Sequence, residues 1–352
     1  FTSDNGPHHE SYLEKVEYNA DSFQSYGPFD GTKRDTWEGG IRMPTLAWRP
    51  GFIPARSIDH RASQFHDWMP TLAQLGGISP PARTDGVSLV STLSQKGKPK
   101  NGTVYIEYNH NGRTKMYSDF SPNKQKKKRG EMQVIHLDGF KGIRHRIQSH
   151  STPFEIYDLN QDPGEEHNLA ESAPEFIELQ QKMKNEVLRL RIPNSSAKRP
   201  YDGEPIPGLI NTTLSSGVAS WQFVKGEFPY VPKFHSAPLG FSSVKAGQGS
   251  AAIGGPMPNG VYRSNLDTTG VMNVLTYIEA KSDGQFTLEF NCSSKAFVRI
   301  HQASIFDADH GYLAGTTLVK KLKLGKGIHP VQITFLTHDE DDQKASFSLK
   351  TK

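Results

Sequence analysis

The first residues of the chain carry side chains that could bind a metal ion. Phe1-Thr2-Ser3 has the character of a strand end, and it runs directly into Asp4-Asn5-Gly6. In open α/β enzymes, ligands bind where strands end. A carboxylate beside an amide oxygen suits Ca²⁺ or Mg²⁺, because these cations prefer oxygen ligands. The same tripeptide also forms ordinary Asx turns, so the residues alone leave both interpretations open.

A second cluster could bind an anion. Lys33 lies in a loop bounded by Gly31 on one side and by Gly39-Gly40 on the other. Its ammonium is a compact charge that suits a tetrahedral oxyanion, and the glycines allow close approach of the backbone. Glu38 and Arg42 are four residues apart, but the two glycines between them argue against a shared helical face.

Four motifs follow one another over the first 190 residues. They are residues 1–8 (FTSDNGPH), 33–51 (KRDTWEGGIRMPTLAWRPG), 66–72 (HDWMPTL) and 154–170 (FEIYDLNQDPGEEHNLA). Together, these ordered motifs resemble the sulfatase family of the alkaline-phosphatase superfamily. The resemblance implies an α/β catalytic domain that hydrolyses sulfate esters, in the manner of an arylsulfatase.

The resemblance also implies roles for particular residues. Asp4 and Asn5 match a pair of metal ligands, usually of Ca²⁺, with Mg²⁺ as a further option. Lys33 matches the catalytic lysine that contacts the sulfate group. His8 follows the metal pair where some sulfatases place a substrate-binding residue, but it or its neighbour His9 could equally be a solvated loop histidine. The implied substrate is a sulfated small molecule or glycan.

The family's nucleophile has no match in the chain. Sulfatases use a formylglycine made from the Cys or Ser of Cys/Ser-x-Pro-x-Arg. Cys292, the single cysteine, is followed by Ser-Ser-Lys, and Ser79-Pro80-Pro81-Ala82-Arg83 falls in the loop after a predicted helix. We therefore expect the formylglycine upstream of Phe1, and we expect the chain to be the C-terminal portion of a longer enzyme, inactive by itself.

Two other functions fit the same residues. A metal-dependent phosphodiesterase or phosphonate hydrolase of the same superfamily would bind a different tetrahedral group, and a Thr at the nucleophile position would favour it. A non-catalytic glycan-binding protein could keep a decayed sulfatase half as a scaffold. The basic run Lys124–Arg129 could steer a polyanion, although such runs are usually solvated loops.

Composition restricts the partners. Lys and Arg number 41 against 37 Asp and Glu, and a net charge of +4 gives little reason to expect nucleic-acid binding. A mean hydropathy of −0.60 and the lack of a long apolar run predict no membrane-spanning helix. The family resemblance leads us to expect a periplasmic or extracellular location.

The elements that must position these residues divide at a Pro-rich stretch. For residues 1–195 we predict the C-terminal part of an alkaline-phosphatase-like α/β sulfatase domain. Its predicted elements are a buried strand at 44–48, a helix at 67–75 ended by two glycines, a strand at 104–108 and a helix from Pro174 to about Leu190. Residues 196–217 lack any apolar period and read as a linker.

Residues 218–352 predict an all-β sandwich domain. The expected strands are 285–290, 296–300, 317–324, 331–336 and 345–349. Residues 277–288 and 327–333 resemble two motifs of PA14-type β-sandwiches, which often accompany carbohydrate-active enzymes, so carbohydrate binding is implied. Asp307, Asp309 and His310 are expected to form a plain exposed turn.

Overall fold

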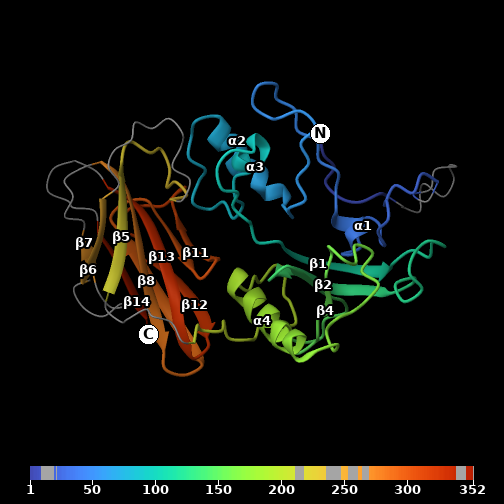
Figure 1. Ribbon diagram of the computed structural model, residues 1–352. Coiled ribbons are helices and arrows are strands. Elements are labelled where there is room, and N and C mark those ends of the chain that lie inside the picture. The colour runs from blue at the N-terminus through green and yellow to red at the C-terminus, as the bar shows by residue number, and fades with distance from the viewer. Residues whose placement is uncertain are drawn as a thin grey trace. The chain divides into compact units, whose positions relative to one another are not determined.

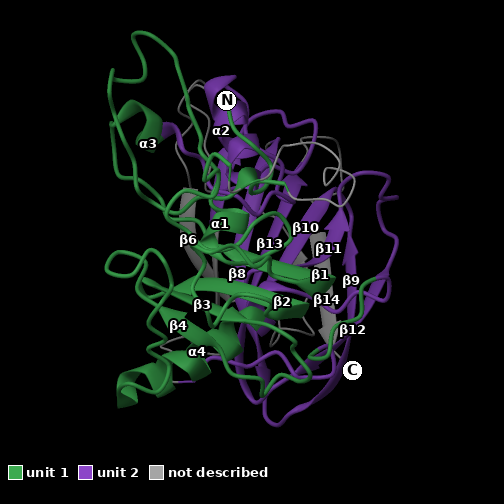
Figure 2. Cartoon of the chain, turned by 90° about the vertical axis from the view of Figure 1, so that its right-hand side faces the viewer, with its two compact units in different colours: residues 1–65, 91–187, 197–201 green, residues 66–90, 188–196, 202–352 purple. Residues whose placement is uncertain are grey.

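The protein forms two compact units in a computed structural model. The model describes residues 1–8, 20, 22–210, 218–234, 247–252, 261–263, 269–337 and 346–351. Unit 1 comprises residues 1–65, 91–187 and 197–201, and unit 2 comprises 66–90, 188–196 and 202–352 (Figure 2). The units alternate along the chain instead of dividing once. The predicted domains 1–195 and 218–352 therefore stay a prediction.

Unit 1 is built on a four-stranded antiparallel sheet of order β1-β2-β3-β4 (Figure 1). The strands are β1 (Tyr105–Arg113), β2 (Lys128–Leu137), β3 (Phe140–Arg144) and β4 (Glu155–Tyr157). Asp138 and Gly139 join β2 to β3 in a two-residue turn, with φ of 52° and 89°. Two consecutive positive φ values match the twist of an antiparallel hairpin. The strand predicted at 104–108 is confirmed by β1.

Helix α4 (Pro174–Leu190) packs on this sheet and confirms the helix predicted from apolar periodicity. A Cβ at Gly142 of β3 would lie 2.4 Å from the sulfur of Met183 on α4. The ring of Phe140 meets that of Phe176 edge to face, with centroids 5.3 Å apart. A glycine in the strand thus lets the helix approach closely while aromatic contacts flank the junction.

The buried strand predicted at 44–48 does not form in the described structure. Thr45 makes an isolated β-bridge with Thr2, while the side chains of Leu46 and Trp48 are 68% and 87% exposed. The segment pairs with so few residues that no sheet covers its faces. An apolar sequence pattern by itself cannot bury a strand.

Unit 2 contains two antiparallel sheets that share one core. The strands are β5 (Val218–Lys225), β6 (Gly247–Ala252), β7 (Val261–Arg263), β8 (Gly270–Ala280), β9 (Gly284–Cys292), β10 (Ala296–Ile300), β11 (Ala303–Ala308), β12 (Leu318–Leu324), β13 (Gly327–Thr337) and β14 (Ser346–Thr351). Their orders are β11-β10-β13-β8-β5-β6 and β12-β9-β14-β7. Phe290 of β9 and Phe335 of β13 belong to the same buried cluster. Burial alternates along β9 and β12, as expected where one face of a sheet covers a core, whereas β8 is buried almost throughout.

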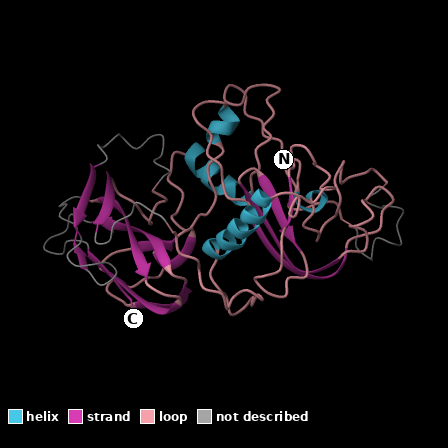
Figure 3. Ribbon diagram, turned by 60° about the horizontal axis from the view of Figure 1, so that its bottom comes forward, coloured by secondary structure: helices cyan, strands magenta, loops and turns pink. Residues whose placement is uncertain are grey.

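The five strands predicted for the C-terminal region correspond to β9, β10, β12, β13 and β14. Figure 3 shows strands and loops in the described residues from 218 onward, without a helix. Unit 2 as a whole is not all-β, because it includes α2 (Trp68–Leu75). This helix confirms the one predicted at 67–75, and Gly76 and Gly77 follow its last residue as expected.

Helix α2 is fixed by side chains at its start. The carboxylate of Asp67 accepts a 2.8 Å hydrogen bond from the backbone of Val87, and Thr71 Oγ1 accepts one of 2.8 Å from Leu89. The remaining helices are the short α1 (Glu38–Ile41), a 3₁₀ turn at Phe65–Asp67 and α3 (Val90–Ser94). Among the described residues, none of the helices has the length and apolar character needed to cross a membrane.

The predicted linker is partly built into unit 2. Ile206 and Leu209 form single β-bridges with Leu324 and Ile328, and Ile206 is 4% exposed within the main core of this unit. A Cβ at Gly208 would lie 2.6 Å from the Cα of Gly327. Residues 202–210 therefore pack as part of unit 2, whereas 211–217 lie outside the described residues.

Candidate functional site

Two loops of unit 1 meet and bring the four candidate site residues into one region. The backbone N–H of Lys33 donates a 2.9 Å hydrogen bond to the carbonyl oxygen of Pro7, and that of Gly6 donates one of 2.9 Å to Gly40. The segment that carries Asp4, Asn5 and His8 is therefore attached to the loop that carries Lys33. His9 lies outside the described residues.

Glycines make this contact possible. A Cβ at Gly6 would lie 2.2 Å from the carbonyl oxygen of Gly39, and a Cβ at Gly40 would lie 2.3 Å from that of Asp35. Both neighbours are backbone atoms that cannot rotate away, so any larger residue would separate the two loops. This explains why the sequence has glycines at these positions beside the candidate site.

The Lys33 loop is held in shape by Asp35. Its carboxylate accepts a 3.0 Å hydrogen bond from the backbone of Thr32 and one of 2.9 Å from Thr114 Oγ1. Arg129 of β2 donates to the same carboxylate from Nε and a terminal nitrogen, at 2.6 and 3.0 Å. Asp35 and Arg129 are both almost completely buried. A bidentate pair of this kind fixes orientation as well as charge.

The basic run Lys124–Arg129 is only in part the solvated loop that we predicted. Lys126 and Lys128 are exposed, whereas Lys124, Lys127 and Arg129 pair with carboxylates. Lys124 is 0% exposed, and its ammonium lies 2.8 Å from the carboxylate of Asp30 and 4.6 Å from the centre of the Trp37 ring. Lys127 pairs with Glu155 at 2.6 Å. A charge run can enter a core when each cation finds a carboxylate, because pairing offsets the cost of desolvation.

A buried triad closes the other end of the Lys33 loop. Lys141 of β3 lies 2.8 Å from Glu38 and 2.7 Å from Glu165, and all three side chains are buried. Burial alone would lower the pKa of Lys141, but the two carboxylates together hold its pKa above the usual value. Burial raises the pKa of Glu165, while the nearby Lys141 outweighs burial at Glu38 and lowers that pKa.

Glu38 and Arg42 also interact, contrary to the expectation from the two glycines between them. Residues 38–41 form the single helical turn α1, and the Arg42 guanidinium lies 3.6 Å from the Glu38 carboxylate. Gly39 and Gly40 are tolerated in this turn because they contact backbone on their open sides. The tertiary contact outweighs their low helix propensity.

Lys33 differs from the cations around it. Among the described residues, its ammonium makes no hydrogen bond or ion pair, although Lys124, Arg129 and Lys141 are all paired. The Asp4 carboxylate, which is exposed, likewise has no partner in the described part of the chain. Side chains that support the fold are thus satisfied internally, and the charge of Lys33 stays available to an anion.

The donors at Asp4 and Asn5 fit a hard cation in type but not in number. The side-chain amide of Asn5 has no partner within the described residues. A carboxylate and an amide oxygen can both bind Ca²⁺, which takes six to eight oxygen ligands. No group of three or more His, Cys, Asp and Glu side chains that could hold a metal ion occurs within the described ranges. Asp4 and Asn5 could therefore form only part of such a site.

Cys292 and Ser79, which the sequence analysis set aside as nucleophiles, are both buried. Cys292 is buried in unit 2 beside Ser294, and burial raises the pKa of its thiol. Ser79 is 5% exposed and also belongs to unit 2. A thiol with a raised pKa is a poor nucleophile because only the thiolate reacts readily.

Sequence reasoning missed the acidic residues that hold the loop. Asp30, Asp35 and Glu38 flank Lys33, and each is buried with a cation from β2, β3 or the segment before β2. Their regular occurrence around one lysine was a signal of internal pairing. Its meaning depended on partners about a hundred residues away in the sequence, since the ion pairs join positions 94 to 103 residues apart.

Comparison with known proteins shows what this part of the chain is similar to. Residues 25–193 match the family model described as N-sulphoglucosamine sulphohydrolase, C-terminal. The chain is 29% identical over 190 residues to human N-acetylgalactosamine-6-sulfatase. This match covers 51% of this chain and 34% of that protein. It is 29% identical over 232 residues to rat arylsulfatase G, covering 58% of this chain and 40% of that protein.

A third relative is bovine arylsulfatase A. The chain is 31% identical to it over 184 residues, covering 50% of this chain and 34% of the relative. The chain thus spans little more than a third of the length of the curated relatives that it matches. The family-model match over residues 25–193 and these relatives show that this part of the chain is similar to sulfatases.

Proposed function

We propose that the chain contributes to a sulfuric ester hydrolase and that Lys33 binds the sulfate group that is transferred. The observation that carries this proposal is that the Lys33 ammonium has no partner among the described residues. It lies on a loop whose acidic residues Asp30, Asp35 and Glu38 are each paired with a cation inside the fold. An ammonium held near developing negative charge stabilises the transition state more than the ground state.

The buried ion pairs keep Lys33 ready to act. Asp35 and Glu38 fix the loop on both sides of Lys33, and the hydrogen bond to Pro7 fixes its backbone. The loop therefore does not need to reorganise when the sulfate ester binds. Such preorganisation is what makes one charged contact effective in catalysis. His8, on the adjoining segment, would contact the rest of the substrate.

Asp4 and Asn5 would hold a Ca²⁺ ion, with Mg²⁺ as the alternative. The ion would supply charge stabilisation for the sulfate oxygens and orient the ester. Further ligands would have to come from outside the described residues, because Asp4 and Asn5 provide only part of a calcium shell. The nucleophilic formylglycine of this proposal would come from outside these 352 residues. Their one Cys/Ser-x-Pro-x-Arg match begins at Ser79, which is buried in the loop after α2.

A sulfated glycan is the substrate class that we favour, in a periplasmic or extracellular protein. The name of the human relative, N-acetylgalactosamine-6-sulfatase, supports a sulfated sugar. The two sheets of unit 2 would form a PA14-like sandwich that assists carbohydrate binding. Both parts of this proposal follow from family likeness, whereas the role of Lys33 rests on geometry.

Hydrolysis by the full-length protein that contains this chain would test the proposal. We expect release of 4-nitrophenol from 4-nitrophenyl sulfate, and release of sulfate from N-acetylgalactosamine 6-sulfate, both sensitive to a calcium chelator. Bis(4-nitrophenyl) phosphate serves as the comparison substrate. Faster hydrolysis of the phosphate diester would favour the phosphodiesterase alternative, and binding of the sulfated sugar without turnover would favour a glycan-binding protein.

A further inference from the structure

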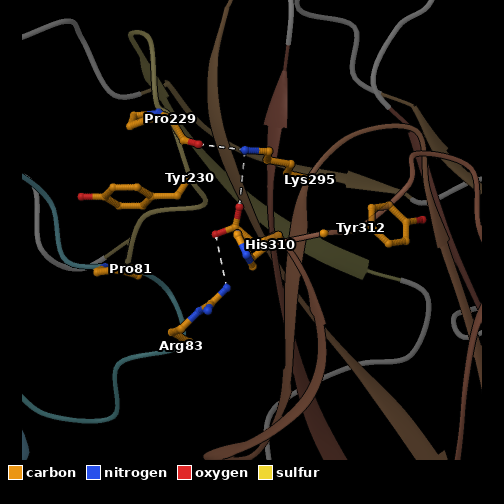
Figure 4. Close-up of a pocket in the computed structure, with 9 residues that line it drawn as sticks. Pro81, Arg83, Pro229, Tyr230, Lys295, His310 and Tyr312 are labelled. Carbon is orange, nitrogen blue, oxygen red and sulfur yellow. Dashed lines mark hydrogen bonds and ion pairs between the residues drawn. The ribbon is translucent and has the colours of Figure 1, made fainter.

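Unit 2 contains a cavity of about 430 Å³ that no part of the proposed hydrolytic site uses. Four segments line it: Pro81 and Arg83 before α3, Pro229 and Tyr230 after β5, Lys295 before β10, and residues 309–312 after β11. Figure 4 shows these side chains, with Arg83 and Lys295 on opposite sides of His310. The volume falls in the range of small-molecule sites.

A buried carboxylate lies between the two cations of this cavity. Asp309 is 6% exposed, so it is not the plain exposed turn residue that the sequence suggested. Its carboxylate accepts a 3.1 Å hydrogen bond from the backbone of Val231. Arg83 and Lys295 each approach it only to 3.9 Å, which is too far for a hydrogen bond.

Arg83 and Lys295 each have a hydrogen-bond partner, and both line the cavity. Arg83 donates a 3.2 Å hydrogen bond to Asp307, and Lys295 donates one of 2.8 Å to the carbonyl oxygen of Pro229. Their side chains are 46% and 44% exposed. Because neither cation hydrogen-bonds to Asp309, both keep N–H donors for a ligand group in the cavity.

The mixture of charges selects a particular ligand chemistry. A bare inorganic anion would be bound by Arg83 and Lys295 but repelled by Asp309. A neutral sugar would satisfy Asp309 through its hydroxyl groups. Among the described residues it would leave Lys295 without an anion at hydrogen-bond distance, whereas Arg83 already pairs with Asp307. A sugar that carries one negative group satisfies all three side chains, while Tyr230 and His310 offer ring surfaces at the wall.

We propose that this cavity binds a saccharide unit bearing a sulfate or carboxylate group. Its anionic group contacts Arg83 and Lys295, and a neighbouring hydroxyl donates to Asp309. The proposal does not rest on sulfate ester hydrolysis, because all of the lining residues belong to unit 2 whereas Lys33 belongs to unit 1. A test of saccharide binding at this cavity can therefore fail while sulfate ester hydrolysis is observed, and the reverse.

Calorimetric titration of the protein with matched sugars tests the proposal. The probes are N-acetylgalactosamine 6-sulfate against N-acetylgalactosamine, and glucuronic acid against glucose. We expect at least one anionic sugar to bind more tightly than its neutral partner, and which one binds tells sulfate from carboxylate recognition. Equal affinity within both pairs would overturn the proposal, as would no detectable binding of any probe.

Variants that remove one positive charge from the cavity test whether the anionic sugar binds there. Lys295→Gln and Arg83→Gln should each weaken anionic-sugar binding by about fivefold, the effect of one partly exposed charged contact. The exposed Lys321 of β12 provides the control, and Lys321→Gln should leave binding unchanged. An equal loss in the Lys321 variant, or no loss in Lys295→Gln, would overturn the assignment. Both side chains are almost half exposed, so both variants should fold.

Discussion

The backbone N–H of Lys33 and the carbonyl oxygen of Pro7 are joined by a 2.9 Å hydrogen bond. This bond connects the segment of Asp4 and Asn5 to the loop of Lys33, whose ammonium has no partner in the part of the chain that the structure describes. In this way the fold places a candidate metal-binding segment beside a candidate anion-binding residue. The first two predictions concern these two parts.

Replacement of Lys33 should reduce turnover of sulfate esters by the full-length enzyme. Lys33→Ala should lower kcat/KM by about 10²–10³, the usual loss for one preorganised contact to a developing oxyanion. Lys33→Arg should restore little activity, because a planar guanidinium does not replace a compact ammonium. The matched control is Lys98→Ala, at an exposed lysine of unit 1, and it should leave kcat/KM unchanged. Near-normal kinetics of Lys33→Ala would place Lys33 outside the site.

Replacement of Asp4 should affect the metal dependence. Asp4→Ala in the full-length enzyme should abolish activity and weaken the rise in melting temperature that Ca²⁺ produces, because a ligand that binds only the folded state stabilises it. Lys33→Ala should keep that rise, since an ammonium is not a metal ligand. A full calcium response in Asp4→Ala would remove Asp4 from the metal site.

The buried triad predicts unequal effects of two substitutions. Lys141→Met should destabilise the protein by about 3–5 kcal/mol, because two buried carboxylates lose their shared cation. Glu165→Gln should cost much less, because Lys141 keeps Glu38 as its partner. Urea unfolding of both variants measures the difference. Similar losses in the two would show that the network acts through packing and not through charge.

Buried histidines predict a loss of stability in mild acid. Burial, helped by the adjacent His329, lowers the pKa of His301 to about 3. Nε2 of His301 lies 3.0 Å from Nδ1 of His329, whose Nε2 lies 2.7 Å from the carbonyl oxygen of Gly325. With both rings neutral, His329 donates to Gly325 and His301 donates from Nε2 to His329. The second proton of a charged His301, on Nδ1, has no acceptor among these three groups.

Proton linkage gives the direction in which stability changes with pH. Below the ordinary histidine pKa of 6.5 the unfolded chain binds a proton that the folded protein excludes, so stability falls as the pH falls from about 6.5 toward 3. Each such histidine contributes a slope of up to about 1.4 kcal/mol per pH unit. Melting temperatures between pH 7.5 and 5 should decline less steeply in His301→Asn. Replacement of the exposed His167 should leave the slope unchanged.

The packing of residues 202–210 predicts a strong contrast between two isoleucines. Ile206→Ala should destabilise unit 2 by about 2–4 kcal/mol, because it removes a side chain from the main core. Ile210 is 81% exposed, and Ile210→Ala should change stability by less than about 0.5 kcal/mol. Equal small effects in thermal unfolding would mean that this stretch behaves as the linker that the sequence suggested.

Helices and strands that are marked by a pattern of neighbouring residues could be predicted from the sequence alone. Helix α4 follows from its apolar period, α2 from its terminal glycines, and β9 from strict alternation after a turn. Each of these patterns depends on neighbours within a few residues, so no tertiary contact is needed to interpret them. The ordered motifs also sufficed to identify the sulfatase resemblance that the family model supports.

Tertiary structure decided which charged and apolar residues are buried. Trp48 stayed exposed because little chain pairs with its segment, while Lys124 became buried because Asp30 lies against it. Asp309 entered a cavity wall through contacts with distant segments. The free energy of a charge or an apolar group depends on the groups packed around it, and those come from remote parts of the chain. Only the fold could show that, within the described residues, the Lys33 ammonium has no partner while Lys124, Arg129 and Lys141 do.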